Sequence, residues 1–79
     1  MNKKTYTPIA LFVKQKRKQT NITQVELADK AGVGLRFVRD LEQNKKSLRV
    51  DKVNDVLILF GCELTPTPIN RDKLLTNGE

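Results

Sequence analysis

Two glycines stand one residue apart in the stretch AGVGLRFVRDLEQNKK, residues 31–46, ahead of an apolar-periodic run that carries arginines. Glycines before a helix can hold a phosphate, because backbone N–H groups at a helix start attract anions. The same pattern can form a sharp turn between two helices, where glycine takes the positive φ that a side chain resists. The chemistry of this stretch is therefore either nucleotide binding or the presentation of a basic helix.

The spacing argues against a nucleotide-binding loop. Such a loop has the pattern G-x-G-x-x-G between a strand and a helix, whereas here Gly32 and Gly34 are followed by Phe37. The preceding residues predict a helix instead, since Thr23 and Glu26 have the T-x-x-E spacing of a capping box. A chain of 79 residues is also too short for the alternating strands and helices of a dinucleotide fold. We favour the turn between two short helices.

The composition excludes several classes of protein. There is no histidine, the single cysteine has no partner, and no pair of carboxylates is placed to line a cleft. We therefore expect neither an enzyme nor a bound metal or cofactor. No apolar run approaches the about 20 residues of a membrane span, and the N-terminus lacks the apolar core of a signal peptide. These features predict a cytoplasmic location.

The positive charge is concentrated at one end of the chain. Residues 1–20 hold six of the 15 basic residues and none of the nine acidic ones. Such an imbalance indicates a polyanionic partner, either nucleic acid or an acidic membrane surface. The apolar stripe Ile9–Phe12–Val13 is too short to bind a membrane surface, and we expect these residues to pack in the hydrophobic core. Nucleic acid is the favoured partner.

Apolar periodicity and capping residues predict helices at about 8–19, 24–31, 35–43 and 50–60. Either Ser47 or Asp51 is expected to cap the last of them, and Gly61 to stop it. Cys62–Thr65 alternates apolar and polar residues between a glycine and two prolines, which predicts a short strand. A lone strand has no partner in the chain, so it is either a frayed tail or pairs with another molecule.

The stretch TQVELADKAGVGLRFVRDLEQNKK resembles the helix-turn-helix of the Cro/phage-repressor (XRE) family. The matching residues are Thr23-Gln24, Leu27-Ala28, Ala31-Gly32-Val33, Val38, Leu41-Glu42 and the basic turn that follows. The resemblance covers about residues 8–60 and implies an all-α, compact four-helix, lambda-repressor-like domain. The longer string YTPIALFVKQKRK…GVGLRFVRDLEQNKKSLRVDKVNDVLILFG is similar to HipB-type antitoxins, which repress their own operon and restrain a HipA-type Ser/Thr kinase toxin.

The resemblance implies that the helix at 35–43 enters the DNA major groove, where base edges carry a distinct donor and acceptor code. The residues expected to read bases are Leu35, Arg36, Arg39 and Asp40. Arginine grips guanine with two hydrogen bonds, whereas Asp40 either accepts from cytosine or orients an arginine. The residues expected to hold phosphates are Thr23, Gln24, Phe37, Gln43, Asn44, Lys45 and Lys46. The alternative is that these are solvated surface residues, with Phe37 in the core.

Two further sets of residues have structural roles in this interpretation. The family pattern pairs Arg17 with Glu42 in an ion pair that joins the first helix to the third. The family's C-terminal strand pairs across a homodimer and corresponds to Cys62, Glu63, Leu64 and Thr65. With this resemblance, the sequence thus predicts four regions: an N-terminal arm at 1–7, a helical DNA-binding domain at 8–61, a dimerisation strand at 62–68 and a flexible tail at 69–79.

The partners expected are thus a second copy of the chain, a palindromic operator with half-sites ~34 Å apart, and a HipA-type toxin, including the form split between two chains. Two alternatives stay open: a stand-alone or phage-type repressor without a toxin, and an interaction module that only neutralises a toxin.

Overall fold

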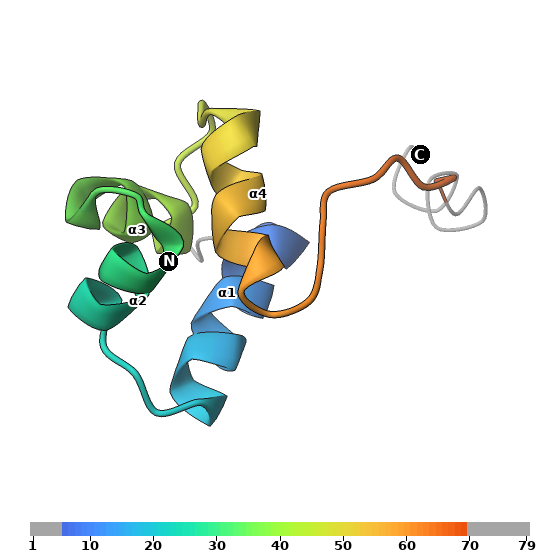
Figure 1. Cartoon of the computed structure of the whole chain (residues 1–79). Helices are drawn as coiled ribbons and strands as arrows, with labels where there is room; N and C mark the ends of the chain where they lie inside the picture. Colours follow the sequence, from blue (N-terminus) through green and yellow to red (C-terminus); the bar gives the residue numbers. More distant parts are fainter. Residues whose placement is uncertain (1–5, 70–79) are drawn as a thin grey trace, which may run out of the picture.

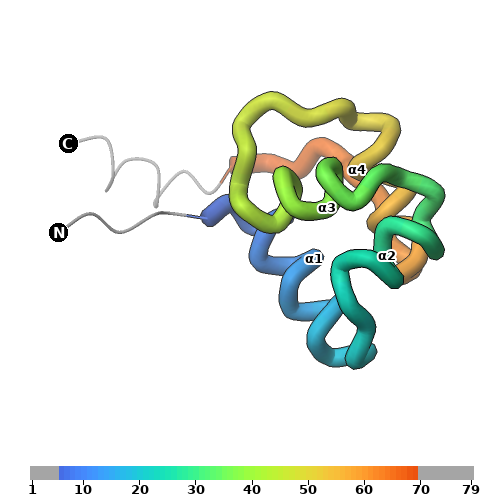
Figure 2. Tube along the Cα trace, turned by 90° about the vertical axis from the view of Figure 1, so that its left-hand side faces the viewer, coloured from blue at the N-terminus to red at the C-terminus, as the bar shows by residue number. Residues whose placement is uncertain are grey.

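The computed structural model describes residues 6–69, which form four α-helices. They are α1 (Pro8–Gln19), α2 (Gln24–Ala31), α3 (Leu35–Glu42) and α4 (Val50–Ile58). In Figure 1, α2 and α3 lie together on one side of the molecule, and α1 and α4 lie on the other. The tube in Figure 2 follows the chain through the turn that joins α2 to α3. The predicted all-α, four-helix fold is confirmed, while most of the predicted arm and tail lies outside the described residues.

Local chemistry accounts for the ends of the first two helices. Thr7 Oγ1 accepts the N–H of Ala10 at 3.3 Å, and Pro8 occupies the first helical position, where a missing N–H costs nothing. Thr23 and Glu26 form the reciprocal capping box, with hydrogen bonds of 3.1 and 2.7 Å. Gly32 ends α2 at φ 73°, in the left-handed region that glycine tolerates. Both helices therefore have the bounds predicted from the sequence.

Helix α4 begins at Val50, as predicted, but its N-cap and its C-terminal end differ from the prediction. Neither Ser47 nor Asp51 caps the helix, whose N-cap is Arg49 without a side-chain cap hydrogen bond. The Asp51 carboxylate instead accepts hydrogen bonds from the Arg49 guanidinium, with Arg49 Nη2 and Asp51 Oδ2 2.6 Å apart. At the other end the α-helix stops at Ile58, and the chain tightens into i to i−3 hydrogen bonds before Gly61 turns it at φ 72°.

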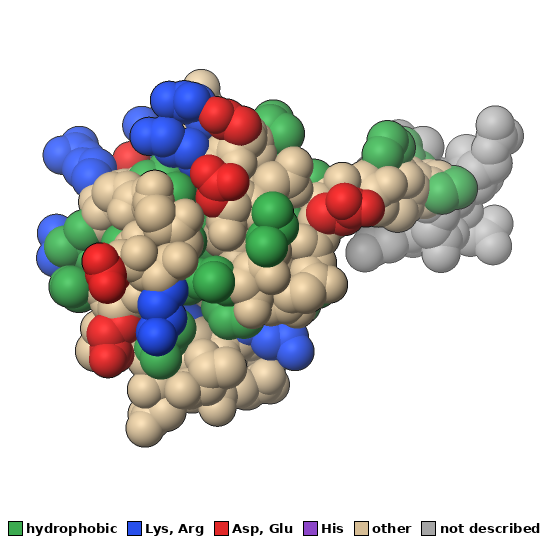
Figure 3. Space-filling model, viewed as in Figure 1, with side chains coloured by type: hydrophobic (Ala, Val, Ile, Leu, Met, Phe, Trp, Pro, Cys, Tyr) green, Lys and Arg blue, Asp and Glu red, His purple; other side chains and the backbone are tan. Residues whose placement is uncertain are grey.

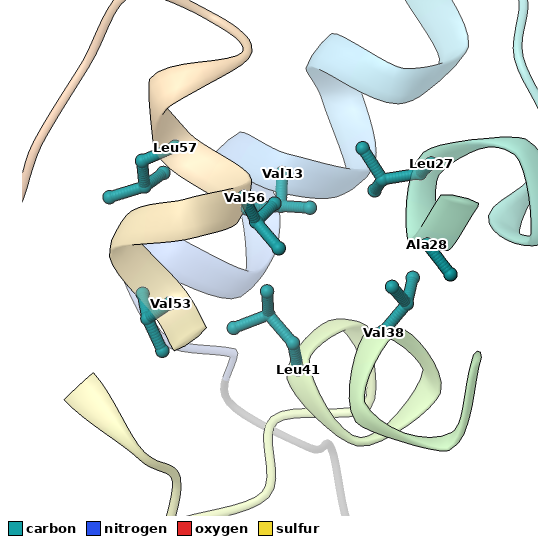
Figure 4. Packing of buried hydrophobic residues seen from close by; sticks show 8 residues of the cluster. All are labelled: Val13, Leu27, Ala28, Val38, Leu41, Val53, Val56 and Leu57. Carbon is teal, nitrogen blue, oxygen red and sulfur yellow. The ribbon is translucent and has the colours of Figure 1, made fainter. Parts of the chain in front are cut away.

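One apolar cluster joins all four helices. Figure 4 shows the buried side chains converging from the separate helices. The cluster comprises Val13 of α1, Leu27 and Ala28 of α2, Val38 and Leu41 of α3, and Val53, Val56 and Leu57 of α4. Burying a side chain of the size of leucine or valine contributes about 1.5–3 kcal/mol. Packing against this cluster thus sets the orientation of the short helix α3, which is too short to be stable alone.

The strand predicted at Cys62–Thr65 is not formed. A strand requires a neighbouring strand for its backbone hydrogen bonds, and residues 6–69 contain none. The N–H of Cys62 is donated to the carbonyl of Leu57 at 3.0 Å, and that of Leu64 to Asn54 Oδ1 at 2.8 Å. Beyond these contacts the segment leaves the helices, as the orange trace in Figure 1 shows.

None of the helices in residues 6–69 has the length and apolar character that crossing a membrane requires.

Candidate nucleic-acid interface

Helix α3 has one face in the core and the other in solvent. Val38, Leu41 and Glu42 are buried, whereas Arg36 and Arg39 are exposed. The side chain of Arg36 is 90% exposed. A guanidinium that is free of the protein interior has its donors available to a base or a phosphate. The helix therefore presents its arginines outward.

The other two residues expected to read bases are less exposed. Leu35 is half-buried and packs against the core, as does Phe37, which was assigned to a phosphate or to the core. Asp40 has a side chain that is 24% exposed and lies between two cations. Its Oδ2 atom is 4.0 Å from Arg36 Nε and 3.5 Å from Lys45 Nζ. Asp40 is thus in position to orient an arginine.

The N-terminus of α2 holds the first group of residues expected to bind phosphate. The hydroxyl of Thr23 accepts the N–H of Glu26, and the carboxylate of Glu26 accepts the N–H of Thr23. Hydrogen bonds from Thr23, first from its backbone and then from its side chain, lower the pKa of Glu26. Gln24, at the first position of the helix, donates from Nε2 to Glu42 Oε1 at 3.1 Å. The sequence did not predict this contact, which fixes the direction of the Gln24 amide.

The turn after α3 holds the second group. Gln43, Lys45 and Lys46 are exposed, and Asn44 adopts the left-handed conformation at φ 70°. Asn44 Oδ1 accepts the N–H of Thr7 at 2.7 Å, which ties the start of α1 to this turn. This contact was not predicted either, because it joins residues 37 positions apart. The turn is therefore anchored at Asn44, while Lys46 is exposed and Lys45, also exposed, lies against Asp40.

A buried ion pair joins α1 to the end of α3. Arg17 Nε and Nη2 donate to the two carboxylate oxygens of Glu42 at 2.7 and 3.0 Å. Arg17 Nη1 also donates to the carbonyl of Ile22 at 3.1 Å. The side chains of Arg17 and Glu42 are 15% and 1% exposed, and the hydrogen bonds to Glu42 raise the pKa of Arg17. This pair positions α3 and is not itself available to a ligand.

The cations gather on the side of the molecule that α3 occupies. In Figure 3, Lys and Arg side chains lie along the upper left edge, where Figure 1 places α3 and the chain leading to α4. Exposed arginines on a short helix, flanked by a helix N-terminus and a basic turn, form a surface that suits the bases and phosphates of a duplex.

A family model described as helix-turn-helix matches residues 13–66, which include most of α1 and all of α2, α3 and α4. The chain belongs to the XRE-type helix-turn-helix family of DNA-binding regulators. It is similar to y4mF of Sinorhizobium fredii, an uncharacterized HTH-type transcriptional regulator, with 46% identity over 61 residues. That alignment covers 77% of this chain and 80% of the relative. In this helix-turn-helix protein, α2 and α3 are the two helices of the motif.

Proposed function

We propose that this helix-turn-helix protein is a sequence-specific transcriptional repressor that binds a palindromic operator as a homodimer. The observation that carries the proposal is the orientation of α3, whose apolar face is in the core and whose Arg36 is 90% exposed. A helix in this position enters the major groove with its N-terminal residues at the base edges. No step of this proposal is catalytic.

The contacts follow from the geometry of each group. Arg36 and Arg39 are assigned to guanine O6 and N7, because a guanidinium matches that pair of acceptors. The start of α2 and the turn at 43–46 are assigned to phosphates on either side of the groove, because backbone N–H groups at a helix start and exposed lysines attract anions. Phosphate contacts set affinity and register, so sequence discrimination rests on α3.

The experiment that tests this function is selection of duplexes from a random pool by the full chain, followed by footprinting of the enriched sequence. We expect enrichment of two inverted half-sites about one helical turn apart. A repressed reporter promoter that carries the selected sequence would support the regulatory role. Recovery of duplexes with no common sequence would contradict specific recognition.

Dimerisation is assigned to the segment Cys62–Thr65. The N–H groups of Cys62 and Leu64 are committed to the helical body. Successive residues of an extended chain direct their backbone groups to opposite sides, so those of Glu63 and Thr65 are available to a second copy. Leu64 is an exposed apolar residue that such a contact would cover.

Truncation tests this assignment. Removal of residues 62–79 should convert the dimer to a monomer by light scattering and weaken binding to the selected duplex. A truncated chain that stays fully dimeric would refute the role of this segment.

We further propose that the protein is the antitoxin of a HipA-type Ser/Thr kinase toxin and regulates its own operon. The support is the resemblance to HipB-type antitoxins over residues 6–18 and 32–61. Co-expression with the kinase-like product of an adjacent gene, in one chain or split in two, should yield a complex and relieve toxicity. Absence of such a gene would favour a stand-alone or phage-type repressor. A complex that forms while the chain binds no duplex would favour a module that only neutralises a toxin.

A further inference from the structure

We propose that Asp40 is an internal counter-ion that sets sequence specificity: it orients Arg36 and competes with phosphates for Lys45. The inference rests on the proposed DNA-binding function and replaces the direct contact to cytosine as the role of Asp40. One oxygen, Oδ2, is shared between Arg36 Nε at 4.0 Å and Lys45 Nζ at 3.5 Å. Asp40 therefore connects a residue assigned to bases with a residue assigned to phosphates.

The contacts of Lys45 with Asp40 involve both backbone and side chain. The N–H of Lys45 is donated to the carbonyl of Asp40 at 3.0 Å, and its ammonium lies against the carboxylate. The side chains of Lys45 and Asp40 are 54% and 24% exposed. Ion pairs with this exposure contribute little to stability and are readily exchanged. A phosphate can thus replace the carboxylate as the partner of Lys45.

Stabilisation of the helix accounts poorly for the order of these two charges, because the basic residue precedes the acidic one. Arg36 lies in the first turn of α3, and Asp40 lies in its C-terminal half. The helix dipole favours acidic residues at the N-terminus and basic residues at the C-terminus, which is the reverse of this order. The positions of Arg36 and Asp40 are therefore better explained by the ligand that the helix meets.

The contact of Asp40 with Arg36 is at Nε, and this leaves the two terminal nitrogens of the guanidinium available. Those nitrogens can bind guanine while Asp40 keeps its contact, so a specific complex retains the attraction between the two residues. On other sequences Arg36 turns to a phosphate and loses that contact, while the carboxylate repels the backbone. Asp40 thus weakens binding to non-cognate DNA more than binding to the operator, which is how specificity arises from a difference of affinities.

The test is Asp40→Asn, which removes the charge and keeps the shape of the side chain. The probes are the duplex selected by the wild-type chain and a scrambled duplex of the same composition, each titrated at several salt concentrations. The variant should bind the scrambled duplex about three- to fivefold more tightly, as expected for loss of one surface charge interaction. Its affinity for the selected duplex should stay within about twofold, because there the gain at Lys45 is offset by loss of the attraction between Asp40 and Arg36. The ratio of the two affinities therefore falls.

Asp29→Asn is the matched control, because Asp29 is exposed on α2 and its replacement changes the net charge equally. The control should alter both affinities by the same factor. A variant with Lys45→Ala should show a smaller gain at the scrambled duplex when Asp40→Asn is added, because the competition then has no lysine to act on.

Three results would overturn the role of Asp40. Weaker binding to the selected duplex alone would identify Asp40 as a direct base reader. An Asp40→Asn profile equal to that of Asp29→Asn would show an effect of net charge only. Loss of both affinities together with loss of helical circular dichroism would show a structural role. A wild-type chain that selects no sequence would instead refute the proposed function, and the affinity for scrambled DNA would still show whether Asp40 competes with phosphates.

Discussion

Asp40 and Glu42 are two acidic residues of the same short helix, and their surroundings are opposite. Glu42 is 1% exposed and accepts two hydrogen bonds from Arg17 and one from Gln24. Asp40 is 24% exposed, and its cations are 3.5 and 4.0 Å away. The direction in which each side chain leaves α3 decides whether its charge holds the helix in place or stays free to exchange partners.

Exposure to solvent explains why the carboxylates of Asp40 and Glu42 differ in their effect. A buried charge is stable only while an opposite charge pairs with it, because removing one member of the pair leaves the other unpaired in a medium of low polarity. A charge at the surface is screened by water and salt, so that its pairs are weak. We therefore expect the buried pair to control stability and the exposed group to control binding.

The largest effect is expected from Arg17→Ala. It leaves the buried Glu42 carboxylate with the Gln24 amide as its one hydrogen-bond partner among residues 6–69, and should lower the free energy of unfolding by about 3 kcal/mol. Urea denaturation measures this change. Arg17→Lys should recover part of the loss, because an ammonium cannot reproduce the two-point contact. The control, Lys18→Ala, removes an exposed neighbouring cation and should change stability by less than about 0.5 kcal/mol. An Arg17→Ala variant as stable as this control would contradict the view that the buried pair controls stability whereas Asp40 does not.

The next effect is at the exposed face of α3, where Arg36→Ala should leave stability unchanged and reduce discrimination. Loss of a bidentate contact to guanine should decrease the preference for the selected over the scrambled duplex by about 1–3 kcal/mol. Fluorescence anisotropy with both duplexes measures the preference. Lys30→Ala, at an exposed position in the last turn of α2, is the control. An unchanged preference in Arg36→Ala would withdraw the assignment of this arginine to a base.

A smaller and uniform effect is expected from Lys46→Ala in the basic turn. Lysine contacts a phosphate without regard to sequence, so affinity for the selected and the scrambled duplex should fall by the same factor. The slope of log affinity against log salt should become less negative by about 0.9, the value for one lost phosphate contact on B-DNA. A change in the ratio of the two affinities would show that Lys46 contributes to sequence reading.

The smallest effect concerns pH and the capping box at α2. Hydrogen bonds from Thr23 hold the pKa of Glu26 below its ordinary value of about 4.3 in the unfolded chain. The stabilisation is therefore complete above that value and is lost as the pH falls through the lower value of the folded state. Thermal melts between about pH 6 and pH 3 should show a smaller loss in Glu26→Gln than in the wild type. Identical pH profiles would show that ionised Glu26 adds nothing to the cap.

Residues close in sequence explain which parts of the fold could be predicted. Thr7 with Pro8, Thr23 with Glu26, and Gly32 each act within one helical turn, so the sequence specified α1 and α2 to the residue. The start of α4 near residue 50 was predicted, but its cap was not, because Asp51 pairs with Arg49 instead of capping the helix. The strand predicted at Cys62–Thr65 is not formed, because a ladder needs a second strand and residues 6–69 offer none.

The amino-acid sequence by itself determined the helices, the turn at Gly32 and the row of arginines on α3, since these depend on spacing and on the conformational preferences of single residues. The tertiary structure decided what each charge does. It placed the Gln24 amide on Glu42, joined Arg17 to Glu42 and tied Thr7 to Asn44. These contacts join residues 18 to 37 positions apart, and they exist only after the core has fixed how the helices cross. The contacts of Asp40 with Arg36 and Lys45 are local instead, because these residues lie four and five positions away in the sequence.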